Sequence, residues 1–154
     1  MEENHKFGCC CRNCSNNFTG EKYERCIDIS EIAKKVRKEI KEKFPNIKTS
    51  VRISRFSGGQ SLDVDITGCD FNPVNPEWDS VDYSYPSKQI YTDEGLQLLK
   101  NIKKIVNQYN FDYSKIEVDY FHVNFYGHVK FDYDFKTKCI ETLKNNVIIT
   151  EVKQ

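Results

Sequence analysis

A change of hydrophobic period, from 3.6 residues to two, constrains the fold of this chain more than any other feature. Between residues 28 and 44, isoleucine and valine recur at helical spacing after the capping-box motif Asp28-Ile29-Ser30-Glu31. Residues 49–67 then alternate apolar and polar side chains around Ser57-Gly58-Gly59-Gln60. Such alternation is typical of strands, and the glycines allow the backbone angles of a tight turn. We therefore expect a helix over 28–44 followed by a β-hairpin.

A looser copy of the same order follows. Residues 93–109 carry an apolar stripe at helical spacing, and residues 116–133 alternate strongly around Gly127, which predicts a second helix and a second hairpin. We further expect a short helix over 135–144 and a last strand over 147–152. The result is an α+β fold with two helices packed on one face of an antiparallel sheet built from two hairpins, after a cysteine-rich N-terminal segment.

Length and composition set the domain organisation. The chain has 154 residues, of which 38% are hydrophobic and 30% charged, and this suits a single core under a heavily solvated surface. We expect a leader over residues 1–27 and one α+β domain over 28–154. No apolar run approaches the roughly 18 residues needed to cross a membrane, and the first residues lack a signal core. We therefore expect a soluble cytoplasmic protein of the host cell, without membrane contact.

The seven cysteines concentrate in the leader. An odd number excludes a fully paired disulfide framework within one chain, and thiols in a reducing compartment more often bind metal or stay free. The C-x2-C spacing lets Cys11 and Cys14 bind one tetrahedral zinc ion, with Cys26 and Cys9 or His5 as further ligands. A redox-labile leader without metal is the alternative. The candidate metal ligands are Cys9, Cys11, Cys14 and Cys26, with zinc as the cofactor.

Charge is balanced overall but unevenly distributed. The 23 basic and 23 acidic side chains exclude a strongly cationic nucleic-acid binder. Residues 34–48 are mostly basic, however, and residues 56–87 carry six acidic side chains and no basic one. A basic helix face can follow phosphates or simply be solvated, whereas an acidic, aromatic segment can dock on a basic partner surface. The nucleic-acid candidates are Lys34, Lys35, Arg37, Lys38 and Lys41, and the partner-binding candidates are Asp70, Glu77, Trp78, Asp79, Asp82, Tyr83 and Tyr85.

Weaker signals concern small ligands and catalysis. The glycine turn can hold an anion with its backbone N–H groups, although a plain turn explains the same residues. Paired carboxylates such as Asp63 and Asp65 suit a divalent ion or acid–base chemistry, but such pairs are common on solvated strands. No nucleophile motif surrounds a cysteine or histidine, so we assign no catalytic residue and favour a binding module over an enzyme. The candidate ligand-binding residues are Ser57, Gly58, Gly59, Asp119, His122, Asn124 and Tyr126.

Several short motifs of the chain resemble those of the large polyvalent protein-associated domain family of phages and conjugative elements. The resemblance covers roughly residues 28–131, through Ile32 to Lys41, Phe44-Pro45, Ser50-Val51-Arg52, Ser57 to Val64, Tyr109-Asn110 and Asp119 to Tyr126. It implies an accessory module of a mobile element, carried beside antirestriction, methyltransferase and helicase domains or standing alone. It brings no catalytic residues to carry over.

Together these features predict a phage or mobile-element accessory protein that binds a host macromolecule. The leading hypothesis is a counter-defence inhibitor, of anti-CRISPR or antirestriction type, whose partner is a host defence protein. One alternative is a nucleic-acid-binding module with a zinc-stabilised leader. The other is a small-ligand or nucleotide-binding protein.

Overall fold

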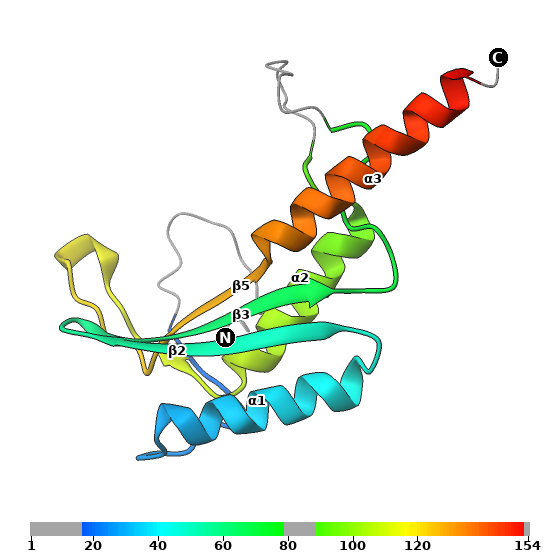
Figure 1. Cartoon of the computed structure of the whole chain (residues 1–154). Coiled ribbons are helices and arrows are strands. Elements are labelled where there is room, and N and C mark those ends of the chain that lie inside the picture. The colour runs from blue at the N-terminus through cyan, green and yellow to red at the C-terminus, as the bar shows by residue number, and fades with distance from the viewer. Residues whose placement is uncertain (1–16, 79–88, 153–154) are drawn as a thin grey trace, which may run out of the picture.

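The computed structural model describes residues 17–78 and 89–152 (Figure 1). The predicted α+β class is confirmed, and so are the helices predicted over 28–44 and 93–109. In chain order the elements are β1 (Phe18–Thr19), α1 (Ile29–Lys43), β2 (Lys48–Phe56), β3 (Gly59–Gly68), α2 (Asp93–Asn107), β4 (Phe111–Asp112), the 3-10 helix η1 (Ile116–Val118), β5 (Tyr126–Phe131) and α3 (Tyr133–Val152).

Side-chain caps fix where the first two helices begin. Asp28 precedes α1 and accepts a hydrogen bond from the backbone N–H of Ser30 at 2.8 Å. Thr92 caps α2 in the same way, accepting from the backbone N–H of Gly95 at 3.1 Å. Both helices pack on the same face of the sheet, α1 against β2 and α2 against β5, as the sequence predicts. The fully buried side chains between them and the sheet include Val36, Ile40, Leu62, Val64, Ile66, Ile102 and Val106.

The central sheet has three strands in the order β2-β3-β5. β2 and β3 form the predicted antiparallel hairpin, with Val51 opposite Val64 and Phe56 opposite Gly59 at the turn. Gly59 has a φ of +147°, a backbone conformation that L side chains rarely adopt, so the turn requires glycine there. β5 lies parallel to β3 at the other side, with Val64 opposite Val129.

The second hairpin predicted over 116–133 is wrong. β5 pairs with β3 rather than with the residues before it, and Gly127 lies inside β5 instead of forming a turn. This glycine serves close packing, because a Cβ atom there would lie 3.0 Å from Cγ1 of Val106 on α2. The chain reverses earlier, at η1 and Asp119, whose φ is 51°.

In the C-terminal region the helix predicted over 135–144 is confirmed, and the strand predicted over 147–152 is wrong. Residues 135–144 and 147–152 belong to the single helix α3, which leaves the sheet and extends away from it (Figure 1). Asp132 caps this helix by accepting from the backbone N–H of Asp134 at 3.1 Å. Each further residue of an existing helix adds a hydrogen bond, whereas a strand over 147–152 would need a partner edge.

The described end of the leader is tied to the domain by backbone hydrogen bonds. β1 pairs with β4, and the N–H groups of Gly20 and Lys22 donate to the carbonyls of Asn110 at 2.7 Å and Gln108 at 2.8 Å. Gly20 approaches so closely that a Cβ atom there would lie 2.3 Å from the Asn107 carbonyl oxygen. Within residues 17–78 and 89–152, no helix combines the length and the apolar character needed to cross a membrane.

Candidate functional site

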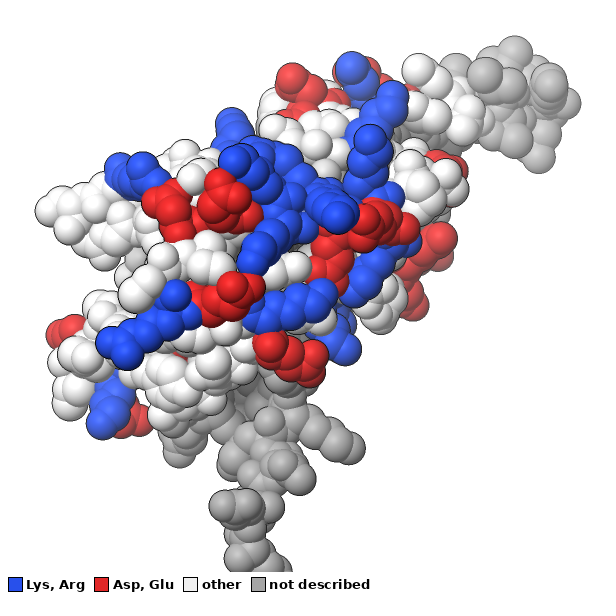
Figure 2. All heavy atoms as spheres, turned by 90° about the horizontal axis from the view of Figure 1, so that it is seen from below, with Lys and Arg blue, Asp and Glu red and all other residues white. Residues whose placement is uncertain are grey.

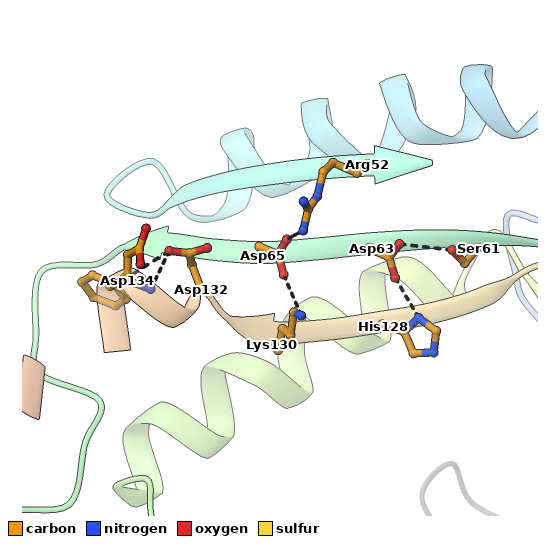
Figure 3. Close-up of polar contacts among 9 residues, drawn as sticks. Arg52, Ser61, Asp63, Asp65, His128, Lys130, Asp132 and Asp134 are labelled. Atoms are coloured by element: carbon orange, nitrogen blue, oxygen red, sulfur yellow. Dashed lines mark hydrogen bonds and ion pairs between the residues drawn. The ribbon is translucent and has the colours of Figure 1, made fainter. Parts of the chain in front are cut away.

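The sheet face opposite α1 and α2 carries polar side chains (Figure 3). At its centre Asp65 lies between Arg52, which donates a hydrogen bond to it, and Lys130, whose ammonium is 3.9 Å away. These long side chains leave the Asp65 side chain only 3% exposed, while they are themselves 65% and 67% exposed. Asp65 is therefore a buried, doubly paired carboxylate, and both of its neighbours are held to it by charge.

A second polar group on this face links β3 to β5 (Figure 3). Asp63 accepts from the Ser61 hydroxyl at 3.1 Å and lies 2.8 Å from Nδ1 of His128. Such a contact orients the imidazole, and Nε2 has no hydrogen-bond partner in the described part of the chain, which suits acid–base chemistry or ligand binding. The Ser61 hydroxyl, however, bonds to Asp63 and not to His128, so these three residues do not form a nucleophile–base pair.

The basic side of α1 is offset by carboxylates. Ion pairs join Lys34 to Glu31 at 2.7 Å, Lys35 to Glu24 at 2.6 Å and Lys38 to Glu42 at 3.9 Å. Arg37 donates instead to the backbone carbonyl of Val51 at 2.7 Å, and Lys41 has no such partner among the described residues. Figure 2, which views the molecule from the α1 side, shows acidic atoms among the basic ones. Little of this charge is left for a phosphate backbone.

A buried carboxylate anchors this network to the core. Glu39 accepts hydrogen bonds from Lys22 at 2.7 Å, Lys43 at 2.6 Å and the Tyr109 hydroxyl at 2.7 Å. Burial of Glu39 opposes its ionisation, but the three hydrogen bonds outweigh that effect and lower its pKa to about 2. Burial and the Glu39 carboxylate raise the pKa of Tyr109, so the hydroxyl keeps its proton and donates.

Residues 111–124 form a hairpin-like projection, which we call the aromatic arm (Figure 1). The N–H of Tyr113 donates to the His122 carbonyl at 2.8 Å, and that of Lys115 donates to the Tyr120 carbonyl at 2.7 Å. The His122 ring packs against Phe111 at 5.0 Å and Tyr120 at 6.0 Å between centroids. The arm is thus an ordered structure built largely from rings.

The outer side chains of the aromatic arm are apolar and exposed. Tyr113 is 41% exposed, Val118 68%, Tyr120 52% and Phe121 61%. At the base of the arm, buried Asn110 donates to the carbonyl of Phe125 at 2.8 Å and accepts from its N–H at 3.2 Å. This clamp holds the exposed end on a rigid base. Several exposed large apolar side chains on one projection are typical of a protein interaction site.

The predicted acidic surface is described only at its start. Asp70 and Glu77 are exposed, and the Asn46 amide donates to Asp70 at 3.4 Å. Asp70 also lines a groove of about 380 Å³ between Phe44 and the first turns of α2. Trp78 is partly buried, and its backbone N–H donates to the carbonyl of Asn75 at 3.0 Å. Asp79, Asp82, Tyr83 and Tyr85 lie outside the described residues.

The candidate ligand-binding residues fall into two places. Gly59 lies at the turn beside Tyr126, and its neighbour Gln60 donates to the carbonyl of Asn124 at 3.0 Å. Ser57 and Gly58 are exposed on the same turn, whereas Asp119 and His122 belong to the aromatic arm. These residues thus lie around the β2–β3 turn and on the arm, and none of the grooves described in residues 17–78 and 89–152 brings them together.

The predicted metal site lies mostly outside the described residues. Cys9, Cys11 and Cys14 precede residue 17, and Cys26 is an exposed free thiol with a φ of 67°. Cys69 and Cys139 are free thiols too, and burial raises the pKa of each. Over residues 17–78 and 89–152 there is no group of three or more histidine, cysteine and acidic side chains placed to bind a metal.

Comparison with models of protein families shows to which family the chain belongs. The family model of large polyvalent protein associated domain 29 matches residues 27–124, from the N-cap region of α1 to the end of the aromatic arm. The chain belongs to this family. Membership places it among the proteins associated with phages and mobile elements. Neither a curated protein nor a solved structure matches the chain significantly.

The domain 29 match includes residues whose role in the structure is now visible. The Tyr109-Asn110 motif holds Glu39 through its first residue and Phe125 through its second. Sequence reasoning missed the exposure of Val118 and Phe121, because the alternation assigned both residues to a strand of the second hairpin. The polar run from Asp112 to Lys115 and the acidic pair around Val118 are the signals that could have indicated an exposed projection.

Proposed function

We propose that this domain 29 protein is a protein-binding accessory module, and that the aromatic arm is its docking surface. The observation that carries the proposal is the exposure of Tyr113, Val118, Tyr120 and Phe121, at 41–68%, on one ordered projection. Aromatic side chains bury large areas at small entropic cost, which is why they are enriched at the centres of interfaces. A lone exposed leucine would need no explanation, but four apolar side chains within nine residues do.

The partner we propose is a host defence protein, which makes the chain a counter-defence inhibitor. Support comes from the family's association with phages and mobile elements and from the acidic, aromatic composition of residues 70–85. Carboxylates interleaved with rings can occupy a basic surface that otherwise holds nucleic acid. The pairing of the α1 lysines with glutamates favours this reading over direct nucleic-acid binding.

Replacement of the arm's outer rings tests the docking surface. Host proteins cross-linked to the chain are compared between wild type and the double variant Tyr120→Ser/Phe121→Ser. The matched control is Tyr133→Ser, because Tyr133 is 73% exposed on α3, away from the arm. We expect the arm variant to lose at least about tenfold of a specific cross-linked partner and the control to keep it. Equal recovery by all three proteins would contradict docking through the arm.

A plating assay tests the counter-defence version separately. Expression of the chain is expected to raise the plating efficiency of a phage that the host restricts or targets, and the arm variant is expected to abolish the rise. Charge reversal at Asp70 and Glu77 tests the share of the acidic segment in the same assay. If the chain captured a partner through the arm but left the plating efficiency unchanged, the proposal of a protein-binding module would stand. The proposal of a counter-defence inhibitor would be contradicted.

A further inference from the structure

A groove runs between α2 and the outer edge of β5, apart from the aromatic arm. It has a volume of about 670 Å³. Leu99 and Val129 supply apolar lining, and Lys100, Lys103, His128 and Lys130 surround them, with Asp63 as the one acidic side chain among the lining residues. Asp63 is already bonded to His128 and Ser61. The groove therefore combines an apolar strip with an excess of positive charge.

The positive charge of this groove is not offset as it is on α1. Neither Lys100 nor Lys103 forms an ion pair with any carboxylate of the described residues. The ammonium of Lys103 donates instead to the backbone carbonyl of Gly127, and burial lowers its pKa. Lys130 lies 3.9 Å from Asp65, a carboxylate that Arg52 already binds. An anionic ligand would thus meet Lys100 and Lys103, which pair with no described carboxylate, while the one acidic lining residue, Asp63, is bonded to His128 and Ser61.

The groove also exposes a strand edge. In the described sheet β5 pairs with β3 on one side only. The N–H of Asp132 donates to the Ile66 carbonyl at 2.9 Å, so the backbone groups of the even-numbered residues of β5 face β3. Those of Gly127 and Val129 then face outward, in agreement with the contact between Lys103 and the Gly127 carbonyl. Outward N–H and C=O groups can hydrogen-bond an added strand.

We propose that this groove binds an extended peptide of alternating acidic and apolar residues, which adds to β5 as an outer strand. In an added strand, successive side chains point to opposite faces of the sheet. One set would lie beside Lys130 and His128 on the open face, and the other beside Leu99 and Lys100 on the α2 side. A peptide suits the site better than single-stranded nucleic acid, because no phenylalanine, tyrosine or tryptophan lines the groove for base stacking and its one ring, His128, is held by Asp63. The groove and the arm are separate surfaces, so the failure of either proposal leaves the other intact.

The test uses a short peptide of alternating valine and glutamate and measures its affinity by fluorescence anisotropy. The protein variant is Lys100→Glu/Lys130→Glu, and the matched control Lys34→Glu/Lys38→Glu changes the net charge equally on α1. We expect the groove variant to weaken peptide binding at least about tenfold and the α1 variant to weaken it less than about threefold. Equal losses in the two variants would overturn the site, and thermal melting of each variant confirms that it is folded.

Backbone methylation of the peptide tests strand addition itself. Two further peptides carry N-methyl groups on one or the other set of alternate amides and keep the charge unchanged. Only one set of amides faces β5 in an added strand, so we expect one methylated peptide to lose at least about tenfold in affinity and the other to bind as before. Unchanged binding of both would overturn strand addition. Tighter binding of a short oligothymidylate than of the parent peptide would overturn the choice of a peptide in favour of nucleic acid.

Discussion

The lysines of α1 and those of α2 look alike in the sequence but differ in their surroundings. On α1, Lys34, Lys35 and Lys38 each pair with a glutamate. On α2, Lys100 and Lys103 have no acidic partner among the described residues, and they line a groove beside an open strand edge. The three paired lysines of α1 thus have less charge to offer than their number suggests. Availability for a ligand depends on pairing, not on the number of lysines.

We expect the largest loss of stability from truncation of Glu39, the buried carboxylate on the α1 side. Glu39→Ala leaves Lys22, Lys43 and the Tyr109 hydroxyl without their shared acceptor. Loss of a buried partner in such a network lowers the free energy of unfolding by about 3 kcal/mol. Urea unfolding measures it, with Glu31→Ala as the control, because the exposed Glu31–Lys34 pair contributes less than about 0.5 kcal/mol. Similar losses in both variants would contradict a buried anchor.

Acid titration tests the contribution of Glu39 to stability, and we expect a somewhat smaller loss than from its truncation. The folded state lowers the pKa of Glu39 from 4.5 to about 2, so its stabilisation is complete above pH 4.5 and is lost as the pH falls toward 2. We expect a loss of about 2 kcal/mol over this window, since solvent screens the half-exposed Lys22 and Lys43. The difference in unfolding free energy between wild type and Glu39→Gln measures it. A difference that stays constant from pH 5 to about 2 would contradict the pairing.

We expect the smallest change in stability from replacement of Lys103, which donates a hydrogen bond to the edge of β5. In Lys103→Met the lost hydrogen bond to the Gly127 carbonyl is offset by the lower cost of burying a neutral side chain, so stability changes by less than about 0.5 kcal/mol. Lys43→Met removes a donor to buried Glu39 and is expected to cost about 1 kcal/mol. Thermal unfolding compares the two. A larger loss in Lys103→Met than in Lys43→Met would show that Lys103 is a structural partner rather than an available charge.

Much of the fold followed from local signals in the sequence. The capping box at Asp28 and the apolar stripes predicted α1 and α2, and alternation around Gly58-Gly59 predicted the first hairpin. The prediction of a turn at Gly127 was wrong, because a glycine in the sequence is consistent with either a tight turn or close packing. In the structure Gly127 packs closely on Val106. Whether a strand pairs with its neighbour in sequence or with a distant one depends on long-range contacts that alternation does not encode.

The candidate sites were less predictable than the fold, for a related reason. Spacing on one helix reveals the pair of Lys34 with Glu31, but Lys35 pairs with Glu24, which precedes α1 in the chain. The sequence therefore overstated the charge available on α1. The sequence also predicted a strand of the second hairpin where the aromatic arm projects. Alternating residues are found both in a strand of the sheet and in the paired backbone of the arm, and only the chain reversal at Asp119 distinguishes the two.

Mapping of backbone amide chemical shifts during titration with the valine–glutamate peptide tests the contrast between the two surfaces most directly. We predict that the largest changes fall on Gly127, Val129 and Lys100, and that the outward amide of Val129 becomes protected from hydrogen exchange. Amides of α1 around Lys34 and Lys38 should hardly move. Changes centred on α1, with the β5 edge unaffected, would contradict the account.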